Sequence, residues 1–330
     1  MSSLSFRRWC CVGAVVASLA AVASALAQVG AYPTHPIKLI VAFPPGGGAD
    51  LTARTLAQKM GEALGQPVVV ENKPGANGSL GTDLVAKSAP DGYTLVLADR
   101  GAFTVNPSLY AKLPYDPLKD LSYVGIATEG PYVLVATPAL NVKTLAELTA
   151  LAKSKPGALN YASFGIGSMP QLNLEAMNRK LGIDIVHVPY KGAGPAAQAV
   201  VSGEVGITIS SIPAVQGFIK DGRLRALAVG SDKRLAQLPD VPTMAEVGGG
   251  ADTLIPTYFA LAAPAGTPPA IVARLNAEMK KALADPGMAE KLVGAGLVPI
   301  GSSPDAMTAS VKQDVARFGA LVKAIGIKPE

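Results

Sequence analysis

Short apolar runs that alternate with helical patterns constrain the fold of this chain more than any other feature of its sequence. Residues 36–43 (PIKLIVAF), 67–72 (PVVVEN) and 93–99 (YTLVLAD) are typical of short buried strands. Helical patterns follow the first two of these strands, at residues 49–65 and 78–89. Strands and helices in this order predict a parallel sheet with helices on its faces.

The alternation repeats, so we expect two α/β lobes. A second block of strands and helices follows from residue 132 to residue 230, and residues 258–285 add a strand, a loop and a helix. The economical arrangement returns this last stretch to the first lobe, with crossings near residues 127–131 and 255–258. Two crossings make a hinge with a cleft, which the loops at the carboxyl ends of the strands should line. The predicted lobes are residues 32–130 plus 258–330 (lobe 1) and residues 131–257 (lobe 2).

The N-terminal segment is typical of a secretory signal. Arginines precede a short apolar run, and small residues at Ala25 and Ala27 predict cleavage of residues 1–27. The alternative is an uncleaved membrane anchor, although the run is short and alanine-rich for a spanning helix. Both cysteines, Cys10 and Cys11, lie in this segment, so the mature chain would lack disulfides, thiol catalysis and cysteine-bound metals. We therefore expect a soluble protein exported to the periplasm.

The composition argues against a nucleic-acid partner. The chain of 330 residues is 49% hydrophobic and 16% charged, with a formal net charge of +5. No cluster of lysine and arginine and no basic helix stripe stands out, so dispersed surface charge explains the positive balance.

A glycine-rich loop joins the first strand to its helix in the stretch FPPGGGAD, residues 43–50. Glycines permit positive φ and close backbone approach. The free amides and dipole of a helix N-terminus favour an anion, and Asp50 is placed to cap the helix. A tight turn without a ligand is the alternative. The dinucleotide fingerprint would need glycine where Leu51 stands, so a carboxylate held by backbone amides fits better.

Four further loops rich in small and polar residues follow other strands. Their presence in both halves of the chain predicts a binding cleft shared between the lobes. They are ENKPGANGSLG (71–81), ADRGAFTVNP (98–107), ASFGIGSMPQL (162–172) and VPYKGAGPA (188–196).

These stretches resemble the Bug-type periplasmic substrate-binding receptors of tripartite tricarboxylate transporters. The resemblance implies an α/β, two-lobed periplasmic-binding-protein fold (type II, Venus-flytrap) with two mixed sheets flanked by helices. It also implies capture of a small carboxylate without chemistry or cofactor, and delivery to the membrane permease subunits; we expect a monomer. The stretches that carry it are residues 32–54, 68–95, 106–120, 187–200, 224–248 and 263–286.

The family's ligand-binding positions carry over to particular residues. Ser210 is included because it follows a strand of the second block, where the family usually has an Asp-Asn pair and this chain has Ser210 and Ser211. The loss of that negative charge leaves the ligand open. Two other departures are Gln171 in place of a histidine and Tyr258 in place of a tryptophan. The implied ligand-binding residues are Pro45, Gly46, Gly47, Asp50, Ser163, Gly165, Gly167, Ser168, Tyr190, Lys191, Gly192 and Ser210.

Asp99 and Arg100 directly follow the third strand, which predicts a place at the cleft mouth. One interpretation is an exposed pair that interacts with other surface charges. The other is that Arg100 clamps a second ligand carboxylate, or that Asp99 receives a ligand amine. The second interpretation places Arg100 in the predicted site.

The sequence offers little for catalysis. The nearest match to a nucleophile elbow, NGSLG, has Asn77 where a glycine is needed. His35 precedes the first strand, and His187 lies in an apolar strand as a core residue would. No metal-ligand spacing appears, so we expect no catalytic residue and no metal. A periplasmic sensor that presents its ligand to a membrane signalling partner remains the alternative to a transport receptor.

Overall fold

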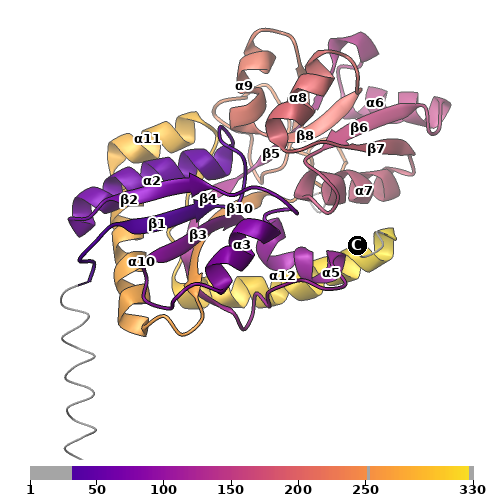
Figure 1. Ribbon diagram of the computed structural model, residues 1–330. Helices are drawn as coiled ribbons and strands as arrows, with labels where there is room; N and C mark the ends of the chain where they lie inside the picture. Colours follow the sequence, from indigo (N-terminus) through magenta and orange to yellow (C-terminus); the bar gives the residue numbers. More distant parts are fainter. Residues whose placement is uncertain (1–31, 251–252, 327–330) are drawn as a thin grey trace, which may run out of the picture.

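The computed structural model describes residues 32–250 and 253–326 (Figure 1). It is an α/β protein with two mixed sheets flanked by helices, which confirms the predicted fold class. The predicted signal segment, residues 1–27, lies outside the described residues. Within the described ranges, no helix combines the length and the hydropathy needed to cross a membrane.

The first sheet has six strands and a helical layer on each face. Helices α2 (Gly48–Leu64), α10 (Pro269–Ala284) and α11 (Pro286–Gly294) cover one face. Helices α3 (Ser79–Ala86), α4 (Arg100–Thr104) and α12 (Pro304–Ile325) cover the other. The strand order is β11 (Val298–Pro299), β4 (Leu121–Gly130), β10 (Thr257–Pro264), β3 (Thr94–Asp99), β1 (Ile37–Val41) and β2 (Val68–Asn72).

The second sheet has five strands and the same layered build. Helices α6 (Leu145–Ser154) and α7 (Met169–Leu181) cover one face, and α8 (Ala193–Val201) and α9 (Ile212–Lys220) cover the other. A short 3-10 helix, η1 (Pro138–Leu140), follows β5. The strand order is β7 (Ile185–Pro189), β6 (Leu159–Ser163), β8 (Ile207–Ser211), β5 (Tyr132–Ala136) and β9 (Arg225–Val229).

The chain passes twice between the sheets. β4 ends at Gly130 and β5 begins at Tyr132, so a single residue makes the first crossing. The return crossing lies between β9 and β10, where the Asn173 side chain accepts from the Ile255 N–H and donates to its carbonyl, both at 3.0 Å. We propose lobe boundaries at these crossings, with residues 32–130 and 258–330 in lobe 1 and residues 131–257 in lobe 2.

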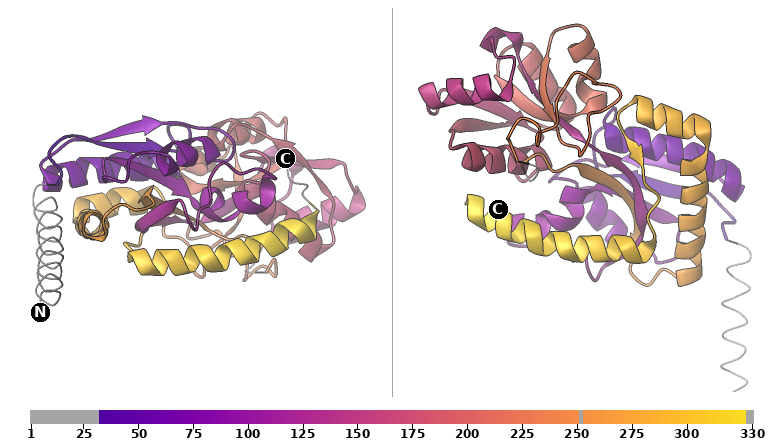
Figure 2. Two further views of the ribbon diagram at one scale, coloured as in Figure 1. Left: turned by 60° about the horizontal axis from the view of Figure 1, so that its bottom comes forward. Right: turned by 180° about the vertical axis from the view of Figure 1, so that it is seen from behind.

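Helix α12 joins the two lobes. Its first half buries Met307 and Val311 against the first sheet. Its second half places Phe318 and Val322 in the core of the second lobe, together with Leu109 of α5 (Asn106–Leu109). Figures 1 and 2 show α12 running along the first lobe and ending beside α7. Any motion of one lobe relative to the other must therefore bend α12 or shift its packing against one of the lobes.

Candidate functional site

Helices of both lobes begin directly after the strands at the cleft side, and two pairs of loops touch. A Cβ on Gly192, before α8, would lie 3.5 Å from Cγ of Pro44, before α2. The backbone of Gly167, before α7, lies against the Leu109 side chain of α5. The lobes are therefore in contact at these two places, each next to the N-terminus of a lobe 2 helix.

The loop before α2 offers backbone amides. Gly47 is the N-cap residue and no side chain caps this helix. The amides of Gly47, Gly48 and Ala49 have no acceptor within the described part of the chain. Gly46 has a φ of +87°, whereas Gly47 has a φ of −90°, so the positive φ expected of these glycines belongs to Gly46. Unpaired amides at a helix N-terminus are a binding site for an anion.

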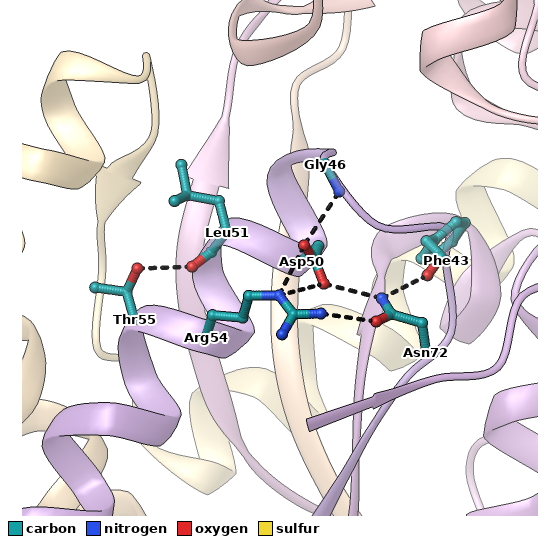
Figure 3. A network of polar contacts seen from close by, with 7 residues as sticks. All are labelled: Phe43, Gly46, Asp50, Leu51, Arg54, Thr55 and Asn72. Atoms are coloured by element: carbon teal, nitrogen blue, oxygen red, sulfur yellow. Dashed lines mark hydrogen bonds and ion pairs between the residues drawn. The ribbon is translucent and has the colours of Figure 1, made fainter. Parts of the chain in front are cut away.

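Asp50 shapes this loop from inside it (Figure 3). Its carboxylate accepts from the Gly46 N–H at 3.1 Å, from Arg54 Nε at 3.0 Å and from Asn72 Nδ2 at 2.9 Å. Burial raises the pKa of Asp50, but the hydrogen bonds from Arg54, Asn72 and Gly46 outweigh it and bring the pKa below its usual value. The predicted helix cap is thus wrong in detail: Asp50 holds the residue before the N-cap, and its charge is paired within lobe 1.

In lobe 2 the predicted serines organise the loop before α7. Ser168 Oγ donates to the Gly165 carbonyl at 2.7 Å. Ser163 Oγ donates to the same carbonyl at 3.1 Å and accepts from the Gly165 N–H at 3.2 Å. Both serines are buried, and Gly165 and Gly167 have positive φ. We name residues 163–168 the serine loop.

His187 and Gln171 hold the serine loop from behind. His187 Nε2 lies 2.6 Å from Ser163 Oγ, and its Nδ1 lies 3.2 Å from Gln171 Nε2. Gln171 Oε1 accepts from the Gly167 N–H at 2.6 Å. Burial lowers the pKa of His187 to about 4, so the ring is neutral at physiological pH. The sequence interpretation of His187 as a satisfied core residue missed its link to the loop.

These contacts fix where the His187 proton resides. A backbone N–H can only donate, so the Gln171 oxygen must face Gly167 and its NH2 must face His187. Nδ1 is then the acceptor, and the ring proton sits on Nε2, pointing at Ser163. A serine nucleophile needs the opposite arrangement, in which Nε2 accepts the serine proton.

The loop before α8 also presents backbone rather than side chains. The Tyr190 hydroxyl donates to Glu204 at 2.7 Å, and burial together with that carboxylate raises the pKa of Tyr190 to about 12. Lys191 is exposed. The amides of Lys191, Gly192 and Ala193 have no acceptor among the described residues. This N-terminus therefore mirrors that of α2 on the other side of the cleft.

Asn77 reaches from lobe 1 to the serine loop. Its Nδ2 donates to the Gly167 carbonyl at 3.2 Å and to Asn106 Oδ1 at 2.8 Å. Asn106 in turn donates to the Asn77 carbonyl at 3.1 Å. Asn77 has a φ of +49°, a conformation that asparagine tolerates better than most residues. The two peptide groups that flank the Gly167 Cα are thus held separately: Gln171, in the same lobe, accepts from the Gly167 N–H, and Asn77, in the other lobe, donates to the Gly167 carbonyl.

Asp99 and Arg100 both make contacts inside lobe 1, although Arg100 Nε is buried without a hydrogen-bond partner among the described residues. Asp99 accepts from the Ala102 N–H at 3.0 Å as the N-cap of α4, and burial raises its pKa to about 6. Arg100 Nη1 donates to Asp314 on α12 at 2.9 Å, and the guanidinium lies 4.5 Å from the Tyr258 ring centroid. The ion pair is mostly buried, with side-chain exposures of 14% and 8%. The interpretation as an exposed pair is therefore wrong. The interpretation of Arg100 as a ligand clamp stays a prediction, and we leave Arg100 out of the proposed site because its Nη1 is paired with Asp314.

Ser210 is the penultimate residue of β8, and its hydroxyl is buried. It is fully buried, and its Oγ has no hydrogen-bond partner within residues 32–250 and 253–326. The described residues also contain no group of three or more His, Cys, Asp or Glu side chains placed to hold a metal ion.

Comparison with known proteins places the chain in a family. Residues 52–327 match the family model described as "Tripartite tricarboxylate transporter family receptor". This chain belongs to that family. It is 40% identical to the protein BugT of Bordetella pertussis over 318 residues, which cover 96% of this chain and 97% of BugT.

Solved structures show the same fold. The periplasmic binding protein BugD is 33% identical, with a TM-score of 0.84 over 91% of this chain and all of BugD. An R. palustris protein with adipate is 34% identical, with a TM-score of 0.85 over 91% of this chain and all of that protein. The family is one of periplasmic solute-binding receptors, and a relative binds a dicarboxylate.

Sequence reasoning missed the side chains that support the predicted loops. Asn77 lies in a loop that the sequence singled out, and its neighbouring glycines were the available signal. His187 and Gln171 were noted but not connected, because a strand and a helix bring them together only in the fold. Leu109 carried no signal, since nothing local marks an apolar residue that packs across two lobes.

Proposed function

We propose that this protein captures a small carboxylate in the cleft between its lobes and delivers it to the membrane permease of a tripartite tricarboxylate transporter. The observation that carries the proposal is the pair of uncapped helix N-termini, α2 and α8, whose loops touch across the cleft. Backbone amides without acceptors on both sides suit the two oxygens of a carboxylate, and both helix dipoles favour its charge.

The charges around the site support a carboxylate over a cation. Asp50 is the acidic side chain of the α2 loop, and Arg54 neutralises it. Lys191 adds a positive charge to the α8 loop. The adipate bound by the R. palustris relative is a carboxylate of the proposed class. A dicarboxylate would place one carboxylate at these amides and leave the second to set selectivity.

The proton arrangement of the serine loop favours binding over acyl transfer. The one serine–histidine contact of the loop, Ser163 with His187, carries its proton on the nitrogen that a general base would need free. Gln171 donates to the histidine, whereas a catalytic triad places an acceptor there. The pair therefore builds the loop.

A thermal-shift screen of organic acids tests the binding proposal. A ligand that binds only the folded state stabilises it by about 2.7 kcal/mol at a hundredfold excess over its dissociation constant. We expect adipate, malate or a related acid to raise the melting temperature, and sugars and metal ions to leave it unchanged. Hits among sugars or cations without any acid would reject the carboxylate proposal.

Two glycine variants, one in the α2 loop and one far from it, show whether the acid binds at the α2 loop. Gly47→Val places a branched side chain beside the free amides, where Cβ meets no atom within 4 Å, so the fold should persist and the acid-induced shift should vanish. Gly217→Val, on the exposed side of α9 and equally free of contacts, is the matched control and should respond like the wild type.

Export and transport need separate tests. We propose cleavage after residue 27, so N-terminal sequencing of exported protein should begin at Gln28; retention of Met1 would contradict it.

Uptake of the identified acid should fall in cells that lack this gene. Normal uptake with a lost transcriptional response to the acid would instead favour a sensor.

A further inference from the structure

We propose that His187 is a positioning residue, which through Gln171 and Ser163 holds the serine loop in the shape that meets both the ligand and lobe 1. Within the described residues, His187 has no hydrogen bond to the α2 loop or to Asn77, so it acts through the serine loop. The effect of His187 on ligand affinity rests on the proposed function. Its effect on the order of the serine loop is independent of that function.

His187 is fixed in place by its neighbours. It pairs with Tyr161 of the neighbouring strand, and the two rings stack with centroids 5.0 Å apart. The fully buried Tyr161 is itself anchored, because its hydroxyl donates to Glu175 on α7. That bond also occupies Glu175, and burial is the cause of the low pKa of His187. The imidazole is therefore held on a rigid strand.

Each nitrogen of the His187 ring supports one part of the serine loop. Nε2 supports Ser163, whose hydroxyl bonds both the N–H and the carbonyl of Gly165. Nδ1 supports Gln171, whose oxygen holds the Gly167 N–H. One side chain thus controls both positive-φ glycines of the loop. Such conformations are costly and persist where surrounding contacts hold them.

The serine loop so held is one of the places where lobe 2 meets lobe 1. The carbonyl of Gly167 accepts from Asn77, and its Cα rests on Leu109. If the Gln171 contact were lost, the backbone on either side of the Gly167 Cα could turn about φ and ψ, and the Gly167 carbonyl would leave Asn77. The contact of Gln171 with Gly167 is therefore needed for the contact of Gly167 with Asn77 in lobe 1.

His187→Phe is the direct test, because it keeps an aromatic ring against Tyr161 and removes both nitrogens. We expect amide exchange at Gly165 and Gly167 to become about tenfold faster or more than in the wild type, without ligand. The matched control is His35→Phe, since His35 is the other histidine, is exposed and stacks on Tyr93. Unchanged exchange in His187→Phe would overturn the proposal.

Nitrogen-15 spectra of the two histidines report which ring nitrogen carries the proton. A residue that only fills space would not change this proton position when Gln171 is replaced. The wild-type His187 ring should be neutral and carry its proton on Nε2. Gln171→Glu replaces the donor by a carboxylate that can only accept, so Nδ1 should gain a proton while Gly167 keeps its acceptor and its protection. A wild-type proton on Nδ1, or no change in the ring in Gln171→Glu, would overturn the assignment even if His187→Phe failed to fold.

Calorimetry with adipate separates this inference from the proposed function. His187→Phe should weaken binding by about five- to a hundredfold, the range expected for two lost hydrogen bonds, and Gln171→Glu should weaken it less. Faster exchange in His187→Phe with unchanged affinity would remove the role in binding. A wild type that has an ordered loop and the Nε2 proton but binds no carboxylate would reject the proposed function and leave the positioning role intact.

Discussion

Gly167→Ala should impair closure of the lobes while leaving each lobe folded. A Cβ at this position would overlap Cδ1 of Leu109 and lie 2.9 Å from its Cγ. Leu109 is buried, at 3% exposure, so its side chain has little room to move. The clash exists only when the lobes are in contact, because Leu109 belongs to lobe 1 and Gly167 to lobe 2.

The cost has two parts that act on different equilibria. Gly167 has a φ of +76°, and an L-residue in this region costs about 1–2 kcal/mol, which lowers stability in open and closed forms alike. Overpacking against Leu109 costs about 1–3 kcal/mol and acts on the closed form. If the ligand is held by the closed form, its affinity falls by about 5- to 150-fold.

Calorimetry with a dicarboxylate and small-angle scattering with and without it measure the two effects. Gly182→Ala is the matched control, since Gly182 has a φ of +61° and no atom within 4 Å of its Cβ position. It should lose stability but not affinity. The double variant Gly167→Ala/Leu109→Ala should bind more tightly than Gly167→Ala alone, because the shortened side chain no longer clashes with the new Cβ. Wild-type affinity in Gly167→Ala, or no rescue in the double variant, would refute the reasoning.

Three further variants test other parts of the account. Arg100→Ala strands the buried carboxylate of Asp314 and should lower unfolding free energy by about 3 kcal/mol, with mono- and dicarboxylates affected equally; a loss confined to dicarboxylates would restore Arg100 to the ligand site. Burial raises the pKa of Asp99 to about 6, so its contribution to stability is present below pH 4 and lost as pH rises through 6; Asp99→Asn should remove that part of the pH dependence in denaturant unfolding. Asn77→Gly keeps the backbone conformation but deletes the bonds to Gly167 and to the buried Asn106 Oδ1, so it should weaken ligand binding by about 0.5–1.5 kcal/mol and also lower the melting temperature, because Asn106 Oδ1 loses its donor.

The strands and helices with clear local patterns were predictable from the sequence, and others were not. The apolar runs at residues 37–41 and 132–136 form strands as expected. The strand Leu121–Gly130 escaped prediction because Gly125 and polar residues interrupt its pattern. It is a strand because β10 and β11 pair with it on either side, which no local window reveals.

The parts of the candidate site that consist of backbone amides were predictable from the sequence. Glycine-rich loops between strands and helices mark free amides whatever the partner, so the α2 and α8 loops could be found from sequence alone. Side-chain partners could not be found, since Arg100 and Asp314 are 214 residues apart in sequence and Asn77 and Gly167 are 90 apart. Arg100 shows the limit: its place directly after a strand was predicted, but its partner Asp314 lies on a distant helix that no local pattern connects to it.

Native mass spectrometry of the protein, gently purified from the periplasm, tests the central claim most directly. The account predicts one small organic acid bound per chain, displaced by excess adipate or malate and absent from Gly47→Val but retained by Gly217→Val. A bound sugar, peptide or metal ion, or an acid retained by Gly47→Val, would contradict the claim that backbone amides in this cleft hold a carboxylate.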